Sequence, residues 1–395
     1  MTTERNKLQL SDMPGSRKVG TALKPCGLVL LSLLGLSVFF ATGCGGGGTG
    51  SGGGGTTQAA TPTIATIPAL NDAVVVALAS ATPGALIYYT VDGTTPTTSS
   101  TRYLAPFLVA TNQTVQAIAQ AGVGSASTVA SQTFTLDIPS ATLVWSDEFN
   151  NSTGANAQPN PAVWTYNTGS DTNQSLDILC AYGSNTSPCN SDNPNAFVDT
   201  NGYLNIVARL PSPGVYTSAE MDTRGLFSFQ YGRLEARIQV PEAQGLWPAF
   251  WLLGNNVDTV GWPGCGEMDV MERINAAGSP DWNQGSIHGT GFTGSNLGTD
   301  YYFPSGQTAA GWHTYGMIKS PNSISYYVDD PTKPYVTYTP ASITPLSGVV
   351  WPFDNGQANY IILNIAIGGS WPGPPNASTP FPSTMLVDYV RVYTN

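Results

Sequence analysis

The sequence is short of charged side chains and almost free of histidine. Only 10% of its 395 residues are Asp, Glu, Lys or Arg, and two are His. Two histidines supply a zinc site or a Ser-His-Asp triad poorly. No glycine-rich phosphate-binding motif stands before an expected helix. Zinc-dependent hydrolysis, a serine-hydrolase triad and nucleotide binding are therefore disfavoured.

Basic side chains are scarcer than acidic ones, with 14 Lys and Arg against 25 Asp and Glu and a formal net charge of −11. The N-terminal region is basic, so the chain that follows it is more acidic still. Nucleic acid and anionic lipid surfaces repel such a chain, whereas a neutral substrate does not. We therefore expect no nucleic-acid partner. The charged residues of the N-terminal region are Arg5, Lys7, Arg17, Lys18, Lys24, Glu4 and Asp12.

Glycine and proline are abundant, at 44 and 30 residues. Many turns, together with the lack of long stretches at the helical period, favour an all-β protein. The length allows two folded units plus a leader and a linker. We expect a signal peptide at 1–44, a glycine-rich linker at 45–60, a small β domain at 61–138 and a larger unit at 142–395.

An apolar run from Gly27 to Phe40 follows the basic residues. It is too short to cross a bilayer comfortably but fits a signal-peptide core. It ends in Ala41-Thr42-Gly43-Cys44, which resembles a bacterial lipobox, so we expect Cys44 to be lipidated. A plain signal peptide with an incidental cysteine is the alternative. The protein is expected to be exported, either secreted or held by lipid alone at the periplasmic face or cell surface.

Three cysteines lie beyond the leader. In an exported protein, Cys180 and Cys189 can close a small loop as a disulfide, and two free thiols are the alternative. Cys265 is left over and is expected to be buried as a small apolar side chain.

Residues 61–138 contain short runs typical of strands, at Val74–Leu78, Val115–Ala119 and Thr133–Asp137. Residues Ile87–Pro96 form a strand followed by an Asp-Gly turn. The stretch resembles the small immunoglobulin-like module attached to chitobiase and many exported bacterial enzymes. It is either a spacer or a sugar-binding module, and Tyr88 and Tyr89 are expected to pack within a strand.

The segment around 267 holds three acids, Glu267, Asp269 and Glu272, among apolar residues. In a regular strand Glu267 and Asp269 share a face and Glu272 points away. One bulge residue, at Val270 or Met271, returns Glu272 to that face. Three carboxylates side by side repel one another, which is costly unless they serve a function. A solvated edge strand is the alternative, but the apolar neighbours and Trp262 disfavour it.

Two carboxyl groups about 5 Å apart suit hydrolysis of a glycosidic bond with retention of configuration. One is ionised and attacks the anomeric carbon, and the other is protonated and assists departure of the leaving oxygen. Their mutual repulsion raises the pKa of one partner and so separates the two roles. Asp269, between them, can hydrogen-bond the nucleophile.

This segment resembles the Glu-x-Asp-x-x-Glu signature of glycoside hydrolase family 16, laminarinase type. The resemblance covers essentially all of 142–395 and implies a concanavalin-like β-sandwich, or jelly roll, with a concave substrate cleft. It also implies that Glu267 is the nucleophile, Asp269 its helper and Glu272 the general acid/base. The other segments that are similar to the family are Tyr231–Arg237, Gly245–Leu253, Ile287–Gly289, Asn364–Gly373 and Met385–Val392.

The resemblance implies endo-acting cleavage of β-1,3-glucan, such as laminarin, by a monomer. Agarases and carrageenases share the bulged motif, but sulfated substrates need a basic cleft, which so acidic a chain supplies poorly. Agarose, mixed-linkage glucan and a non-catalytic glucan-binding role remain alternatives, and exo-action stays open. Ile318-Lys319 departs from a Glu-Trp pair that is common in the family. The substrate is expected to contact Trp247, Trp251, Trp262, His288 and Trp371, since aromatic rings stack on sugars.

No cofactor is expected for the chemistry. Members of the family often hold one structural calcium on the convex face, which prefers hard oxygen ligands. Glu148 and Asp388 match the positions expected for it, where the ion ties the first strand of the domain to the last. Two unrelated surface acids are the alternative.

Overall fold

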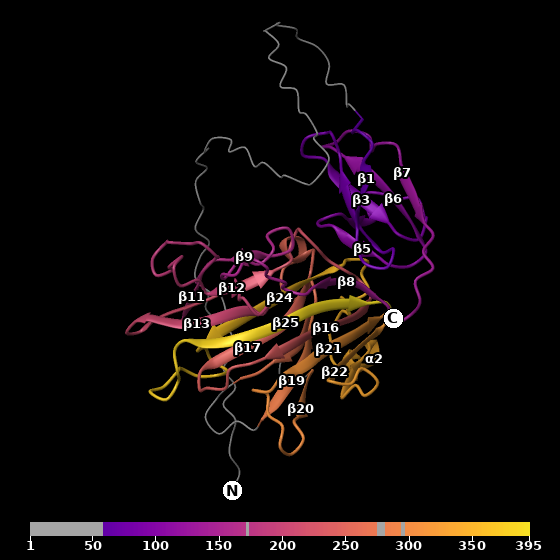
Figure 1. The fold of residues 1–395 in the computed structure, drawn as a ribbon. Helices are drawn as coiled ribbons and strands as arrows, with labels where there is room; N and C mark the ends of the chain where they lie inside the picture. The colour runs from indigo at the N-terminus through magenta and orange to yellow at the C-terminus, as the bar shows by residue number, and fades with distance from the viewer. Residues whose placement is uncertain (1–57, 171–173, 275–280, 294–296) are drawn as a thin grey trace, which may run out of the picture. The chain divides into compact units, whose positions relative to one another are not determined.

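The computed structural model describes residues 58–170, 174–274, 281–293 and 297–395 (Figure 1). The predicted signal peptide, Cys44 and most of the predicted linker lie outside the described residues. None of the helices within them has the length and apolar character needed to cross a membrane. The regular secondary structure of the described residues is almost entirely β-strand, which confirms the all-β prediction.

The small β module contains two sheets. One has the order β1 (Thr63–Pro68), β2 (Val74–Ala79), β5 (Phe107–Val109), and the other β4 (Thr101–Arg102), β3 (Leu86–Thr90), β6 (Gln113–Gln120), β7 (Ala130–Phe134). The strand expected at 133–137 therefore ends early, at Phe134. The predicted Asp92-Gly93 turn is present. Gly93 adopts φ 78°, and the Asp92 carboxylate accepts hydrogen bonds from Thr94 N and Oγ1. Tyr89 is buried and stacks on Phe107 with ring centroids 4.8 Å apart, as expected for strand packing.

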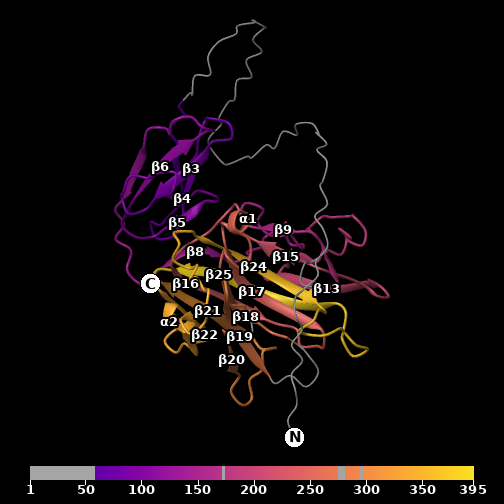
Figure 2. The ribbon, with the colours of Figure 1, turned by 180° about the vertical axis from the view of Figure 1, so that it is seen from behind.

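The larger unit contains two big sheets. The eleven-stranded sheet runs β10 (Gly169–Ser170), β11 (Asp177–Leu179), β14 (Val215–Ser218), β13 (Leu204–Ser212), β25 (Ser383–Tyr393), β16 (Gly232–Gln239), β21 (His313–Ser320), β22 (Ser323–Val328), β23 (Val336–Tyr338), with β12 (Ala196–Val198) beside β13 and β8 (Leu143–Asp147) beside β25. The seven-stranded sheet runs β20 (Gly298–Tyr302), β19 (Trp282–His288), β18 (Glu267–Glu272), β17 (Leu246–Gly254), β24 (Asn359–Ile367), β15 (Glu220–Asp222), β9 (Thr165–Asn167) (Figure 2). The described helices, α1 (Val257–Val260) and α2 (Pro340–Ile343), are one turn each.

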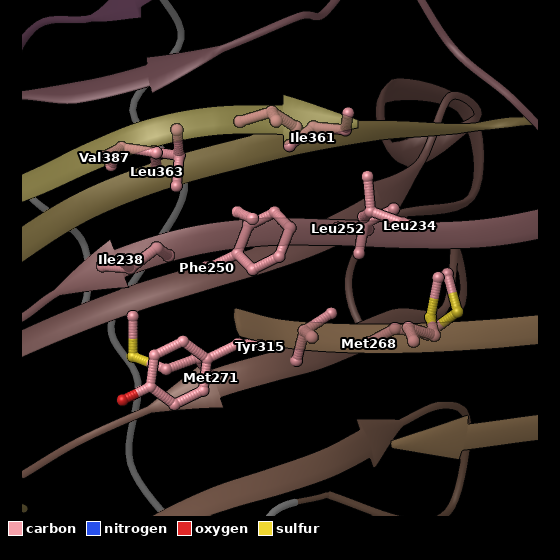
Figure 3. Packing of buried hydrophobic residues seen from close by; sticks show 14 of the residues in the cluster. Leu234, Ile238, Phe250, Leu252, Met268, Met271, Tyr315, Ile361, Leu363 and Val387 are labelled. Carbon is pink, nitrogen blue, oxygen red and sulfur yellow. The ribbon is translucent and has the colours of Figure 1, made fainter. Parts of the chain in front are cut away.

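The core lies between these two sheets (Figure 3). Alternate residues of each strand point to opposite faces, so every second side chain of β17 and β16 enters the core. Phe250 and Leu252 come from the seven-stranded sheet, Leu234 and Ile238 from the eleven-stranded one, and all four are fully buried. Burying such a side chain stabilises the fold by about 1.5–3 kcal/mol. The other face of β17 and β18 is thereby left for polar and aromatic residues.

The three cysteines beyond the predicted leader behave as predicted. Cys180 and Cys189 form a disulfide with Cα atoms 5.6 Å apart, and Cys265 is a free thiol with 1% exposure.

Lys319, which belongs to the Ile318-Lys319 pair that departs from the family pattern, is buried. Its Nζ donates to the Gln230 carbonyl at 2.8 Å and to Asn359 Oδ1 at 2.9 Å, and burial lowers its pKa to about 7. Lys319 is thus a packing element at the end of β21.

Candidate active site

A β-bulge in β18 sets the geometry of the acidic segment. Trp251 of β17 pairs with Asp269, and the residue before it, Phe250, pairs with Met271. Val270 is therefore the extra residue, with no partner of its own on β17. The register with β19 shifts across the same stretch. The predicted bulge is confirmed, and Val270 is its extra residue. Without it, Glu272 would point into the core.

The bulge brings all three acids to one face of the sheet. Glu267, Asp269 and Glu272 lie opposite Leu253, Trp251 and Ala249, which are alternate residues of one strand. On the other side, β19 supplies two more side chains to this face. His288 lies opposite Glu267, and Ser286 lies opposite Asp269. The face therefore gathers three carboxyls, one imidazole and one hydroxyl.

Asp269 is the centre of this group, and it is only 2% exposed. Its Oδ2 lies 3.0 Å from His288 Nε2 and accepts a hydrogen bond from Ser286 Oγ at 2.6 Å. His288 Nε2 also lies 3.7 Å from Glu267 Oε1. Asp269 thus contacts both side chains that β19 supplies to this face, His288 and Ser286, while its predicted helper role toward Glu267 stays a prediction.

Glu267 is the more exposed of the two glutamates, although burial still raises its pKa to about 8. Burial and the neighbouring Asp269 raise its pKa, while His288 and a hydrogen bond from Trp262 oppose the rise. Trp262 Nε1 donates to Glu267 Oε2 at 2.6 Å. Hydrogen bonds to a carboxylate stabilise its charged form. Glu267 also keeps 14% of its side-chain surface exposed, which leaves it open to an incoming substrate.

Glu272 has the environment of a carboxylic acid. It is 8% exposed, and burial followed by the charge of Asp269 raises its pKa well above the usual range. Trp247 Nε1 donates to its Oε1 at 3.1 Å, and Ser286 Oγ lies 3.2 Å from its Oε2. Because Glu272 is the more buried of the two glutamates, it holds its proton to higher pH than Glu267 does.

The carboxyls around His288 favour its protonated form. Burial alone would lower its pKa, but the hydrogen bond to Asp269 and the charges of Asp269, Glu267 and Glu272 raise that pKa to about 9. One imidazolium therefore offsets part of the negative charge on this face. A positively charged His288 beside Glu267 favours the ionised form of that carboxyl.

Aromatic rings stand at both ends of the acidic row. Trp262 is 55% exposed, and its ring lies 6.2 Å from that of His288 near Glu267. Trp371 is 36% exposed and meets Trp247 edge-on, with centroids 5.2 Å apart, near Glu272. Trp251 donates its Nε1 hydrogen to Asn364 Oδ1 at 3.0 Å. All five residues predicted to contact substrate thus come from the strands and loops around the three acids.

The structure adds residues that the sequence did not single out. Ser286 contacts both Asp269 and Glu272, Asn364 holds the Trp251 ring, and the buried Trp282 lies 6.0 Å from Trp371. Ser286 was within reach of sequence reasoning, because it lies two residues before His288 and shares its face. Asn364 was not, since its place depends on the pairing of β24 with β17.

The two residues predicted to bind calcium are engaged in ion pairs. Both Glu148 oxygens accept hydrogen bonds from Arg391, at 2.9 and 2.7 Å, and Asp388 Oδ2 accepts one from Arg237 at 2.7 Å. Within the described ranges, neither acid belongs to a group of three side chains able to share an ion. As arranged, these two carboxylates fit a calcium ion poorly, because a guanidinium repels a nearby cation.

Comparison with known proteins matches both units of the chain. Residues 163–390 match the model of glycosyl hydrolases family 16, and residues 69–132 that of the chitobiase/beta-hexosaminidase C-terminal domain. A beta-glucanase of Rhodothermus marinus is 36% identical over 64% of this chain and 84% of its own length. Glucan endo-1,3-beta-glucosidase A1 of Niallia circulans is 34% identical over 64% of this chain and 37% of its own length. The structure of an endo-beta-1,3-glucanase from Pyrococcus furiosus is 37% identical, with a TM-score of 0.54, and matches over 64% of this chain and 94% of that one.

Proposed function

Because this chain belongs to glycosyl hydrolase family 16, we propose that it hydrolyses internal β-1,3 links of laminarin-like glucans with retention of configuration at the anomeric carbon. The observation that supports this most directly is the bulge at Val270, which places Glu267, Asp269 and Glu272 on one face. A pair of carboxyls, one held ionised and one held protonated, is the equipment that retaining hydrolysis requires.

The reaction has two displacements. In the first, Glu267 attacks the anomeric carbon while Glu272 gives its proton to the glycosidic oxygen, which leaves as an alcohol. In the second, Glu272 takes a proton from water, and the resulting hydroxide displaces Glu267 from the same carbon. His288, which contacts Asp269, lies beside Glu267 and offsets its negative charge before the first displacement and after the second.

A neutral glucan suits the chemistry of this face better than a sulfated one. The acidic row and the negative net charge both repel sulfate. The similar proteins named above are glucanases by name. A non-catalytic glucan-binding role is disfavoured, because such a protein has no need for three mutually repelling acids held at one place. Agarose and mixed-linkage glucan remain the alternative substrates.

A reducing-sugar assay tests this proposal. Laminarin, agarose and a mixed-linkage β-1,3/1,4-glucan are incubated with the full chain, with Glu267→Gln as the matched blank. New reducing ends from laminarin, released as a ladder of oligosaccharides, are the expected result. Rapid cleavage of agarose with none of laminarin would leave the mechanism standing and overturn the substrate. Binding of laminarin without cleavage would support the glucan-binding alternative.

The exposed rings of Trp262 and Trp371 are proposed to stack on glucose units. Trp371→Ala should raise the KM for laminarin about 10-fold, equivalent to ~1.4 kcal/mol of lost binding. Trp262→Ala should raise KM similarly and also lower kcat, because its Nε1 hydrogen bond to Glu267 is lost. Trp262→Phe keeps a ring without that donor, so it should lower kcat and leave KM nearly unchanged. Unaltered KM in both alanine variants would remove stacking from the account.

Export and lipid anchoring through Cys44 also stand as a proposal, supported by the lipobox-like sequence before it. The anchored form should partition with membranes, and Cys44→Ala should not. Monomeric action stays a prediction.

The structural calcium at Glu148 and Asp388 likewise remains a proposal, and the ion pairs of both acids weigh against it. If calcium is bound, chelation should lower the melting temperature while leaving the chemistry unchanged, since a ligand of the native state stabilises it. An identical melting curve with and without chelator would reject the site.

A further inference from the structure

The Ser286 side chain lies between the two ends of the catalytic row. It is fully buried on β19. Its Oγ lies 2.6 Å from Asp269 Oδ2, 3.2 Å from Glu272 Oε2 and 3.3 Å from His288 Nε2. A hydroxyl has a single hydrogen to donate and two lone pairs to accept with. Because the single hydroxyl hydrogen can serve only one of these three contacts, the other two depend on which neighbouring atoms carry a hydrogen of their own.

The short contact identifies the acceptor in the resting state. The hydroxyl hydrogen goes to Asp269, because that distance is the shortest of the three. Two oxygens without a proton between them repel, so the contact with Glu272 Oε2 is favourable only when Glu272 is protonated and donates to Ser286 Oγ. Trp247 already donates to the other oxygen of Glu272, which leaves Oε2 to hold the proton.

Once Glu272 has lost its proton, the donor and acceptor of this contact must exchange roles, so that Ser286 Oγ donates to Glu272 Oε2. In the first displacement the Glu272 O–H bond breaks, its proton goes to the glycosidic oxygen, and the C1–O bond gives its electron pair to that oxygen. Glu272 Oε2 is then a negative acceptor. A rotation about the Ser286 Cβ–Oγ bond turns the hydroxyl hydrogen from Asp269 to Glu272. The serine keeps its proton throughout, and only the acceptor changes.

We propose that Ser286 is a positioning residue whose hydroxyl switches between Asp269 and Glu272, and so stabilises the Glu272 carboxylate that proton transfer to the leaving group creates. The inference rests on the proposed role of Glu272 as the acid. Within the described part of the chain, Glu272 receives one other hydrogen bond, from Trp247. Losing Ser286 therefore removes one of two donors to the developing charge.

The other groups around Glu272 do not replace this donor. Glu267 and Asp269 on β18 are acceptors, and His288 on β19 is directed to Asp269. From β22, Tyr326 donates its hydroxyl to the Ser286 carbonyl at 2.8 Å, and Tyr338 on β23 donates to the Gly285 carbonyl at 3.2 Å. Both tyrosines are neutral, since burial raises their pKa values. They hold the backbone of β19 and leave the Ser286 hydroxyl free to turn.

The test compares substrates that differ in how much they need an acid. Ser286→Ala should lower kcat/KM on laminarin about 10-fold to 100-fold, the range for losing one hydrogen bond to a charged group. KM should change little. The second substrate is an aryl β-glycoside of a β-1,3-linked gluco-oligosaccharide, whose aryl leaving group departs without protonation. On it the decrease in kcat/KM should be several-fold smaller. The basic limb of the kcat/KM profile should move to higher pH, because the Glu272 carboxylate has lost a donor.

Two further variants and a control make the result decisive. Ser286→Cys keeps a side chain of similar shape with a weak donor and should behave like Ser286→Ala, whereas Ser286→Thr keeps the hydroxyl and should restore most activity. Ser218→Ala removes a fully buried hydroxyl that has no partner among the described residues, and should leave kinetics unchanged. Equal losses on both substrates, or an unmoved pH profile in Ser286→Ala and Ser286→Cys, would overturn the proposal. An inactive wild-type protein would instead contradict the proposed function.

Discussion

Glu267→Gln and Glu272→Gln are each expected to lower kcat on laminarin by roughly 10³-fold or more, because covalent catalysis or proton transfer is lost. The amide has nearly the shape of the carboxyl, so the folded structure should be kept. The two variants should differ on an aryl glucoside with a good leaving group. Glu272→Gln can still form the glycosyl-enzyme, which mass spectrometry would detect, whereas Glu267→Gln cannot form it.

Stability measurements on the same variants serve as the control for folding. Burial and the charge of Asp269 raise the pKa of both glutamates. A carboxyl with a raised folded-state pKa favours folding at pH values below about 4.5, and this contribution is lost as pH rises through the folded-state pKa. At neutral pH the acids therefore destabilise the fold, and either amide should raise the melting temperature by a few degrees, roughly 2–5 °C. Near-normal turnover in either variant would remove that residue from the mechanism.

Much of the site follows from strand parity, that is, from the rule that alternate side chains of a strand point to opposite faces of the sheet. Acids at i, i+2 and i+5 share a face only if one residue is extra, and the apolar Val270 and Met271 are the residues available for it. The structure places the bulge at Val270. Strand parity also places Ser286 beside Asp269 once His288 is known to lie opposite Glu267. The family resemblance, which the comparisons confirm, pointed to the His288 segment, and the structure supplies its pairing with β18.

Other features depend on contacts between distant segments, which a single sequence does not reveal. Asn364 meets Trp251 because β24 pairs with β17. Glu148 meets Arg391 because β8 pairs with β25, and Asp388 meets Arg237 because β16 pairs with β25. Both acids that resemble calcium ligands in sequence therefore have arginine partners. The buried Lys319 is another case, since a lysine in a strand is expected at the surface. Its burial depends on the Gln230 carbonyl and the Asn359 side chain.

Proton NMR of the earliest products from laminarin tests the two-displacement mechanism most directly. Each displacement inverts the anomeric carbon once, so two restore the β configuration. The account predicts that β-anomeric reducing ends appear first and that the α-anomer grows in only at the rate of mutarotation. A predominance of the α-anomer at the first time points would mean a single inverting displacement by water, and would contradict the roles assigned to Glu267 and Glu272.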